Sequence, residues 1–362
     1  MHWFLLALIV PYIFILFRIY HGLKKVEPYI PDKDHSLFVS VIVACRDEEK
    51  RLPLLMRDIS GQSVNPDLFE LIIVDDNSSD STINIASGFT GIKNLKVLKS
   101  PGKGKKKALR TGIGASSGSL IITTDADCRM DNRWLETIVS YYCHNIPEII
   151  ICPVRLESGK GFFHRFQQLE FLSLQGITAG TVITGNPVMC NGASLAFRKE
   201  AYFRHSGNMH DELASGDDIF LLHSIKRESP EKILWLESPS AMVTTCASKT
   251  LYAFLKQRAR WISKTGYYTD RFTQVLAIVT FVTILLQAFL LAGGLFSPDL
   301  LLVFITFYAL KSITDYLIMA NVAIRYGENN LMRWFLPSQL VYPFYVIAVA
   351  IYSLRHRPKE SF

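Results

Sequence analysis

Long uncharged, apolar segments near both ends of the chain constrain its fold more than any other feature of the sequence. Four such segments are present, at residues 3–17, 272–298, 300–324 and 334–354. About 20 apolar residues suffice for a helix to cross a bilayer. The only charges within them, Lys311 and Asp315, lie four residues apart and can neutralise each other on one helix face, which favours a structural role over transport. We therefore predict an N-terminal transmembrane anchor (1–22), two to three C-terminal transmembrane segments (271–354) and a tail (355–362).

Basic residues beside these segments predict the orientation of the chain. Arg18, Lys24 and Lys25 accompany the first segment, and positive charge marks the cytoplasmic side of a membrane. A cleaved signal peptide is the alternative, but neither a basic leader nor a small-x-small cleavage site is visible. The last segment either spans the membrane or is re-entrant or interfacial, because spanning would leave the basic tail outside. We expect an integral membrane protein whose central part is cytoplasmic.

Composition excludes several classes of protein. Hydrophobic residues make up 49% of the 362 residues and charged residues 20%, so the chain is not disordered. The net charge of +7 fits a membrane surface or a phosphate-bearing ligand. We expect no nucleic-acid partner, because no RNA- or DNA-binding motif accompanies the charge. The six cysteines form no C-x-x-C pair, which is typical of reduced thiols in the cytosol.

Residues 36–245 alternate between strand-like and helix-like runs, which predicts an α/β domain with a mostly parallel sheet flanked by helices. The predicted strands are 38–44, 70–74, 95–98 and 120–123, and the predicted helices are 49–60, 80–86 and 105–115. No G-x-G-x-x-G follows the first strand, which disfavours a dinucleotide-binding domain. The glycines at 102 and 104 lack the spacing of an ATPase phosphate loop. The basic run Lys103–Lys107 is either a solvated surface or a phosphate site.

Carboxylates follow the predicted strands at the edge where open α/β sheets bind ligands. Asp125 and Asp127 form a D-x-D after an apolar strand, and such oxygens suit Mg²⁺ or Mn²⁺. A plain loop turn is the alternative. Asp75-Asp76 also follows a strand, where an Asx-turn is the alternative. Gly216-Asp217-Asp218 precedes an amphipathic run, where the acids could simply stabilise a helix N-terminus.

Residues 246–270 form a predicted interfacial amphipathic segment before the C-terminal membrane segments. It contains Gln257, Arg260 and Trp261 in a Q-x-x-R-W pattern. A helix lying on the membrane surface with its basic side chains in water is the alternative explanation. Histidines occur singly, and a metal-ligand role for His210 stays open.

Taken together, these motifs resemble the membrane-embedded family 2 inverting glycosyltransferases with a GT-A fold, such as cellulose, chitin and hyaluronan synthases and ceramide glucosyltransferase. The matching segments occur in the family's order and spacing over about residues 36–265. They are Val39–Ala44, Ile73–Thr82, Gly104-Lys105, Thr124–Asp127, Asn191–Ala193, Gly216–Asp218 and Gln257–Trp261.

The resemblance implies a role for each site residue. Asp76 contacts the uracil end of a UDP-sugar, and Ala44 and Arg46 line the base pocket. Lys105 approaches the nucleotide. Asp125 lies by the ribose and metal, and Asp127 holds the Mg²⁺ or Mn²⁺ that bridges the diphosphate.

The remaining matches concern the acceptor. Asp218 corresponds to the general base, with Asp217 where the family more often has Glu. Gln257, Arg260 and Trp261 correspond to the motif that closes over the diphosphate and the acceptor. A base on the acceptor hydroxyl and cationic stabilisation of the leaving diphosphate are what an inverting transfer requires.

We therefore expect a membrane-anchored enzyme that moves a hexose or N-acetylhexosamine from a UDP-sugar to a lipid-linked or polysaccharide acceptor. Its catalytic domain would lie on the cytoplasmic side, as in a bacterial inner membrane, in contact with membrane lipid. Two alternatives stay open. One is a processive polysaccharide synthase, which would have to oligomerise because one chain has few membrane segments for a polymer channel. The other is a non-catalytic scaffold or transporter subunit.

Overall fold

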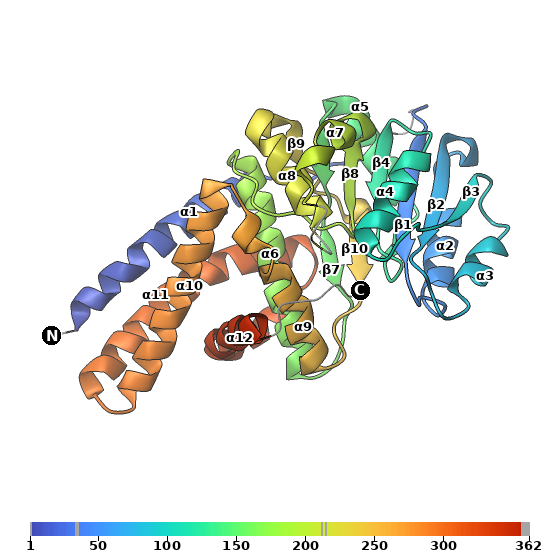
Figure 1. Cartoon of the computed structure of the whole chain (residues 1–362). Helices are drawn as coiled ribbons and strands as arrows, with labels where there is room; N and C mark the ends of the chain where they lie inside the picture. The colour runs from blue at the N-terminus through green and yellow to red at the C-terminus, as the bar shows by residue number, and fades with distance from the viewer. Residues whose placement is uncertain (1, 33–35, 211–212, 214–215, 356–362) are drawn as a thin grey trace. The chain divides into compact units, whose positions relative to one another are not determined.

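The computed structural model describes residues 2–32, 36–210, 213 and 216–355, and the chain forms two compact units (Figure 1). Within the described residues, one unit consists of 2–26, 158–188 and 247–355, and the other of 27–157 and 189–246. We call them the helical unit and the sheet unit. The predicted domain 36–245 is therefore divided, because residues 158–188 cluster with the terminal helices. Most of the predicted tail, 356–362, lies outside the described residues.

The sheet unit is built on a seven-stranded sheet. In spatial order its strands are β3 (Leu95–Lys99), β2 (Phe69–Asp75), β1 (Val39–Cys45), β4 (Leu120–Thr123), β8 (Leu195–Arg198), β6 (Ile149–Ile151) and β9 (Ile233–Trp235). β1, β2 and β4 are buried along their whole length, as strands covered on both faces of a parallel sheet are. The predicted α/β fold and all four predicted strands are confirmed, with ends that differ by at most one residue.

The far half of this sheet is mixed. β8 pairs antiparallel with both β4 and β6, whereas the other pairs are parallel. A second sheet consists of β5 (Arg129–Met130), β10 (Val243–Thr245) and β7 (Val154–Leu156). The helices of this unit are α2 (Leu52–Ser60), α3 (Thr82–Ser87), α4 (Lys105–Ala115), α5 (Trp134–Asn145), α7 (Lys199–Arg204) and α8 (Asp217–Glu228).

Within the helical unit, four helices are long and apolar enough to cross a membrane. They span Trp3–Lys24, which contains α1 (Val10–Lys24), α10 (Arg271–Gly294), α11 (Pro298–Arg325), and Asn329–Arg355, which contains α12 (Phe335–Arg355). Figure 1 shows α10 and α11 running side by side across the view, whereas α12 is seen close to end-on. α12 therefore crosses that hairpin at a large angle.

Two further helices complete this unit, α6 (Phe162–Ile183) and α9 (Leu251–Ile262). α6 approaches α1 closely because Gly180 has no side chain: a Cβ there would lie 2.4 Å from the Ile19 carbonyl oxygen. Gly176 likewise lets α11 approach closely, because a Cβ at this position would lie 2.6 Å from Ile318 Cγ2. Small residues four apart allow such close helix packing in membrane proteins. This explains why residues 158–188 belong with the terminal helices.

Candidate active site

The loops that follow β1 and β2 hold each other in place at the carboxyl edge of the sheet. Asp47 Oδ1 accepts a hydrogen bond from the Ser79 backbone N–H at 2.7 Å, and the Glu49 N–H donates to Asp80 Oδ2 at 3.1 Å. The Glu48 N–H donates to Thr82 Oγ1 at 2.8 Å. These bonds fix residues 47–49 as part of the loop, and α2 begins at Leu52 rather than at the predicted residue 49.

Asp76 is fully buried directly after β2. Its Oδ1 accepts the Gly104 N–H at 2.8 Å, and the nearest cation to its Oδ2 is the Arg46 Nη1, at 3.9 Å. Oδ2 accepts no hydrogen bond from the part of the chain that the structure describes. Burial raises the pKa of this carboxyl, although Gly104 and Arg46 oppose the shift. Ala44, buried in β1 beside Val74, lies at the same edge.

Lys105 joins two of the predicted acidic clusters. It begins α4, directly after Gly104, whose φ of +112° favours glycine. Its ammonium group donates to Asp125 Oδ1. Burial acts to lower the pKa of Lys105, but the charges of Asp125, Asp217 and Asp218 outweigh it and hold that pKa above its ordinary value. The electrostatic link indicates that the D-x-D and the start of α8 lie near one another.

Asp127, the second carboxylate of the D-x-D, is half-buried like Asp125. Its Oδ2 accepts a hydrogen bond from Thr245 Oγ1 of β10 at 3.1 Å. Burial and the Asp125 charge raise the pKa of Asp127, partly offset by Thr245, Arg51 and Lys105. A cation bound beside Asp127 would stabilise its carboxylate, because it would offset the burial and the Asp125 charge.

Two residues near this pair were not predicted. Burial raises the pKa of Glu48, and the charges of Asp127 and Asp125 add to the shift, while Arg51 opposes it. The Arg51 guanidinium lies 3.4 Å from Glu48 Oε2. Both residues stand in the loop after β1, and only its content of charged residues could have drawn attention to it.

The donor set fits Mg²⁺ or Mn²⁺ bound partly by a substrate. Among the described residues, no group of three His, Cys, Asp or Glu side chains could hold a metal. A site with only two carboxylates, Asp125 and Asp127, suits a hard cation that takes its other ligands from phosphates and water. His210 therefore belongs to no three-residue metal cluster among the residues that the structure describes.

Asp218 lies in the first turn of α8, where the helix dipole favours a carboxylate. Its Oδ2 accepts the Gly192 N–H at 3.2 Å, and Thr123 at the end of β4 donates to the Gly192 carbonyl oxygen at 3.1 Å. Gly192 thus connects Asp218 to the strand that leads into the D-x-D. Gly216, the residue before the helix, has a φ of +109°.

The Q-x-x-R-W residues belong to α9 of the helical unit. Gln257 Oε1 accepts a hydrogen bond from Arg258 at 2.6 Å, and the Arg258 guanidinium lies 4.1 Å from the centre of a Trp261 ring. No described residue forms a hydrogen bond or ion pair with the side chain of Arg260, so this cation is free to bind an anion.

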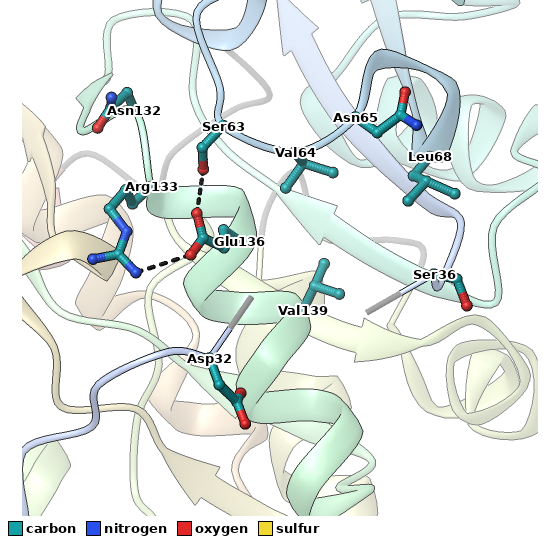
Figure 2. Close-up of a pocket in the computed structure, with 10 residues that line it drawn as sticks. All are labelled: Asp32, Ser36, Ser63, Val64, Asn65, Leu68, Asn132, Arg133, Glu136 and Val139. Atoms are coloured by element: carbon teal, nitrogen blue, oxygen red, sulfur yellow. Dashed lines mark hydrogen bonds and ion pairs between the residues drawn. The ribbon is translucent and has the colours of Figure 1, made fainter. Parts of the chain in front are cut away.

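A cavity of about 720 Å³ in the sheet unit contains none of the predicted site residues (Figure 2). Ser63 and Arg133 both bond to Glu136 on its wall, so its most polar groups satisfy one another. Val64, Leu68 and Val139 supply its apolar lining. Nothing in its chemistry connects it to a sugar nucleotide.

The sheet unit has a fold of the GT-A type, with carboxylates at the carboxyl edge of its sheet. Residues 40–206 match the family model described as glycosyl transferase family 2. The predicted resemblance to family 2 glycosyltransferases is confirmed over these residues: the chain carries a domain of this family.

Similar proteins agree with this assignment. A mannosyltransferase from Pyrobaculum calidifontis, solved with GDP-Man and Mn²⁺, shares the fold over 97% of this chain and 99% of its own, with a TM-score of 0.62 and 18% identity. The glycosyltransferase AglE of Haloferax volcanii is 34% identical over 105 residues, 28% of this chain and 34% of AglE. Human dolichyl-phosphate beta-glucosyltransferase is 35% identical over 118 residues, 29% of this chain and 36% of that enzyme. The chain thus spans only about a third of the length of these two relatives.

Proposed function

We propose that this protein is an inverting glycosyltransferase that moves a hexose or N-acetylhexosamine from a UDP-sugar to a lipid-linked or polysaccharide acceptor at the cytoplasmic face of a membrane. The observation that carries the proposal is the connected series of contacts in the sheet unit. It runs from Asp76 through Gly104-Lys105 to Asp125, and Gly192 joins Asp218 to Thr123, at the end of the strand that leads to Asp125.

The donor would bind along this series. The Asp76 carboxylate would accept an N–H of the base, once Arg46 moves away from it. Lys105 would then face the diphosphate, because its ammonium lies at the start of α4 beside Asp125. The Lys105 ammonium would exchange the Asp125 carboxylate for the diphosphate, so this partly buried cation would keep an anionic partner.

Asp125 and Asp127 would hold Mg²⁺ or Mn²⁺, which when bound supplies Lewis-acid stabilisation of the leaving diphosphate. Thr245 orients one of these carboxylates by its hydrogen bond to Asp127. The resemblance assigns the Arg260 cation of α9 to the same diphosphate charge.

The chemical step requires a base on the acceptor. The Asp218 carboxylate would take the proton of the acceptor hydroxyl as its oxygen attacks the anomeric carbon from the side opposite the diphosphate. The bond to the diphosphate breaks as the new glycosidic bond forms, so the configuration inverts. The Gly192 N–H donates to Asp218 Oδ2 and so orients this carboxylate at the start of α8.

The helical unit supports an acceptor that is carried by a lipid. Four apolar helices accompany the catalytic domain, and the human relative is named for a dolichyl-phosphate acceptor. An acceptor carried by a lipid would be delivered at the membrane surface, where α9 offers Gln257 and Trp261.

The test is a donor screen with protein purified into lipid nanodiscs. UDP-sugars and GDP-mannose are supplied with Mn²⁺ or Mg²⁺ and membrane-lipid acceptors, and products are identified by mass. We expect metal-dependent transfer of a single sugar from one UDP-sugar. A ladder of products would instead indicate a processive synthase, and no turnover of any donor would support a non-catalytic subunit.

Variants at the acidic pair separate chemistry from binding. Asp218→Asn cannot accept a proton, so it should lower single-turnover transfer by about a hundredfold or more while donor affinity is unchanged. Asp217→Asn should have a milder effect. Near wild-type transfer by Asp218→Asn, or complete loss in Asp217→Asn alone, would show that the base is misassigned.

A further inference from the structure

Arg258 differs from the other basic residues of α9. Its side chain is buried, with 4% of its surface exposed, whereas Lys256 is exposed and Arg260 is half-buried with no side-chain partner among the described residues. Burial of a guanidinium costs free energy of hydration unless hydrogen-bond acceptors and a counter-ion surround it. The contacts of Arg258 therefore indicate what it does.

Among the described residues, the hydrogen bonds and ring contacts of the Arg258 side chain are with residues of the helical unit. Nε donates to Glu170 Oε1 at 2.9 Å, and Nη2 donates to Glu170 Oε2, so the pair is bidentate. Nη1 donates to Gln257 Oε1 at 2.6 Å. The guanidinium carbon lies 4.6 Å from the centre of the Phe254 ring and 4.1 Å from that of Trp261.

Glu170 is fixed in turn. It is buried on α6, and its Oε1 also accepts a hydrogen bond from Tyr345 of α12 at 3.1 Å. The Tyr345 ring stacks on Phe254 with 5.1 Å between centres. Arg258 is thus held by groups from α6 and α12 while it contacts two members of the Q-x-x-R-W pattern on α9.

We propose that Arg258 is a positioning residue that fixes the amide of Gln257 and the indole of Trp261, with Glu170 and Tyr345 fixing Arg258 itself. The proposal rests on the proposed function, in which Gln257 and Trp261 meet the acceptor. Arg258 does not bind phosphate, because its donors are directed at Glu170 and Gln257 and its planar group lies over aromatic rings. Arg260 is the residue left for an anionic ligand.

The proposal predicts a kinetic effect confined to the acceptor. Loss of Arg258 frees the Gln257 amide to rotate and removes the cation over the Trp261 ring. Misplacement of binding groups by about 1 Å can cost about a hundredfold in rate. We expect the kcat/KM for the acceptor to fall by about tenfold to a hundredfold, while the Kd for the donor changes by less than about twofold.

The experiment compares variants in nanodiscs. Arg258→Met alone leaves a buried Glu170 charge and can fail to fold, so the decisive variant combines Arg258→Met with Glu170→Gln, which removes both charges. Arg258→Lys keeps one charge but not the planar fork, and should recover only part of the acceptor kcat/KM. Lys256→Met removes an exposed charge from the same helix and should behave as wild type.

A second measurement does not depend on activity. The fluorescence of Trp261, obtained as the difference from a Trp261→Phe protein, should change in the double variant and not in Lys256→Met. Wild-type acceptor kinetics in a folded double variant, or full recovery by Arg258→Lys, would overturn the positioning role. If the wild-type protein transfers no sugar, the proposed function fails, but the Trp261 signal still tests the packing of Arg258.

Discussion

The pair Lys311 and Asp315 gives the most quantitative test of the helical unit. Lys311 is 1% exposed and Asp315 8% exposed, within a helix that is otherwise apolar. The Lys311 ammonium donates to Asp315 Oδ2 at 2.6 Å and to Gln339 Oε1 at 2.9 Å. Tyr12 of α1 donates to Asp315 Oδ1 at 2.7 Å. The pair therefore connects α11 to both α1 and α12.

The expected energies follow from what each substitution leaves behind. Lys311→Met leaves a carboxylate buried without its counter-ion, and Asp315→Leu leaves a buried ammonium. Either change should lower the free energy of unfolding by about 3–5 kcal/mol. The combination of Lys311→Met with Asp315→Leu removes both charges and should restore stability to within about 1 kcal/mol of wild type, since a buried pair often contributes little net stability. Tyr12→Phe should cost about 1–3 kcal/mol, because one carboxylate oxygen then lacks its donor.

Unfolding titrations in mixed detergent micelles would measure these four proteins beside wild type. A double variant at least as unstable as either single variant would refute the reasoning, and a loss equal to the sum of the two single losses would show that the effects are independent. Sugar transfer by the double variant addresses its role: wild-type activity is expected of a structural pair. Lost activity in a stable double variant would instead give these residues a function in the membrane.

Three further predictions concern other parts of the chain. Asp127→Asn should abolish metal-dependent UDP-sugar binding in calorimetry, because one of two metal carboxylates is lost, and undiminished metal-stimulated binding would contradict the assignment. Gly180→Ala should destabilise the helical unit by about 1–3 kcal/mol, since its Cβ meets the Ile19 carbonyl oxygen, whereas Gly266→Ala, with open space around it, should unfold as wild type does. In a protein without native cysteines, a cysteine at the exposed Ser158 should resist impermeant thiol reagents in intact cells, and labelling without lysis would contradict a cytoplasmic location.

The strands of the sheet could be predicted because their burial is local and continuous. β1 and β2 are runs of apolar residues bounded by charged or turn residues, and α4 spans Lys105–Ala115 as expected after Gly104. The start of α2 could not be predicted, because it depends on hydrogen bonds between the loops after β1 and β2. Such pairing between distant segments leaves no periodic signal in the sequence.

The placement of α6 escaped the sequence analysis for a related reason. Its mixture of apolar side chains with Gln167, Glu170 and Gln175 does not resemble a membrane segment, and its role depends on which residues it meets. The small-residue pair Gly176 and Gly180 was the available signal. Likewise, the carboxylates of the site could be found at strand ends, but Thr245 comes from a strand more than a hundred residues further along the chain.

The geometry of Asp76 bears on the choice of nucleotide. A carboxylate with both oxygens free can accept the two adjacent N–H donors of guanine, whereas uracil offers a single N–H between two carbonyl oxygens. Asp76 Oδ1 already accepts the Gly104 N–H, and Oδ2 is the oxygen without a hydrogen bond. One remaining acceptor matches uracil, and the nearby Arg46 can donate to a uracil carbonyl after it moves aside.

This geometry predicts that UDP binds more tightly than GDP, in contrast to the base present in the Pyrobaculum calidifontis complex. With a single acceptor, guanine would bury one N–H unpaired, at a cost of about 1–3 kcal/mol, or roughly a tenfold to hundredfold difference in Kd. Competition between UDP and GDP at fixed Mn²⁺ measures the ratio directly. Asp76→Ala should weaken UDP more than GDP and so reduce the ratio, whereas Asp67→Ala, on an exposed loop at the opposite end of β2, should leave it unchanged. Equal affinities of the wild-type protein for UDP and GDP would mean that Asp76 does not distinguish uracil from guanine.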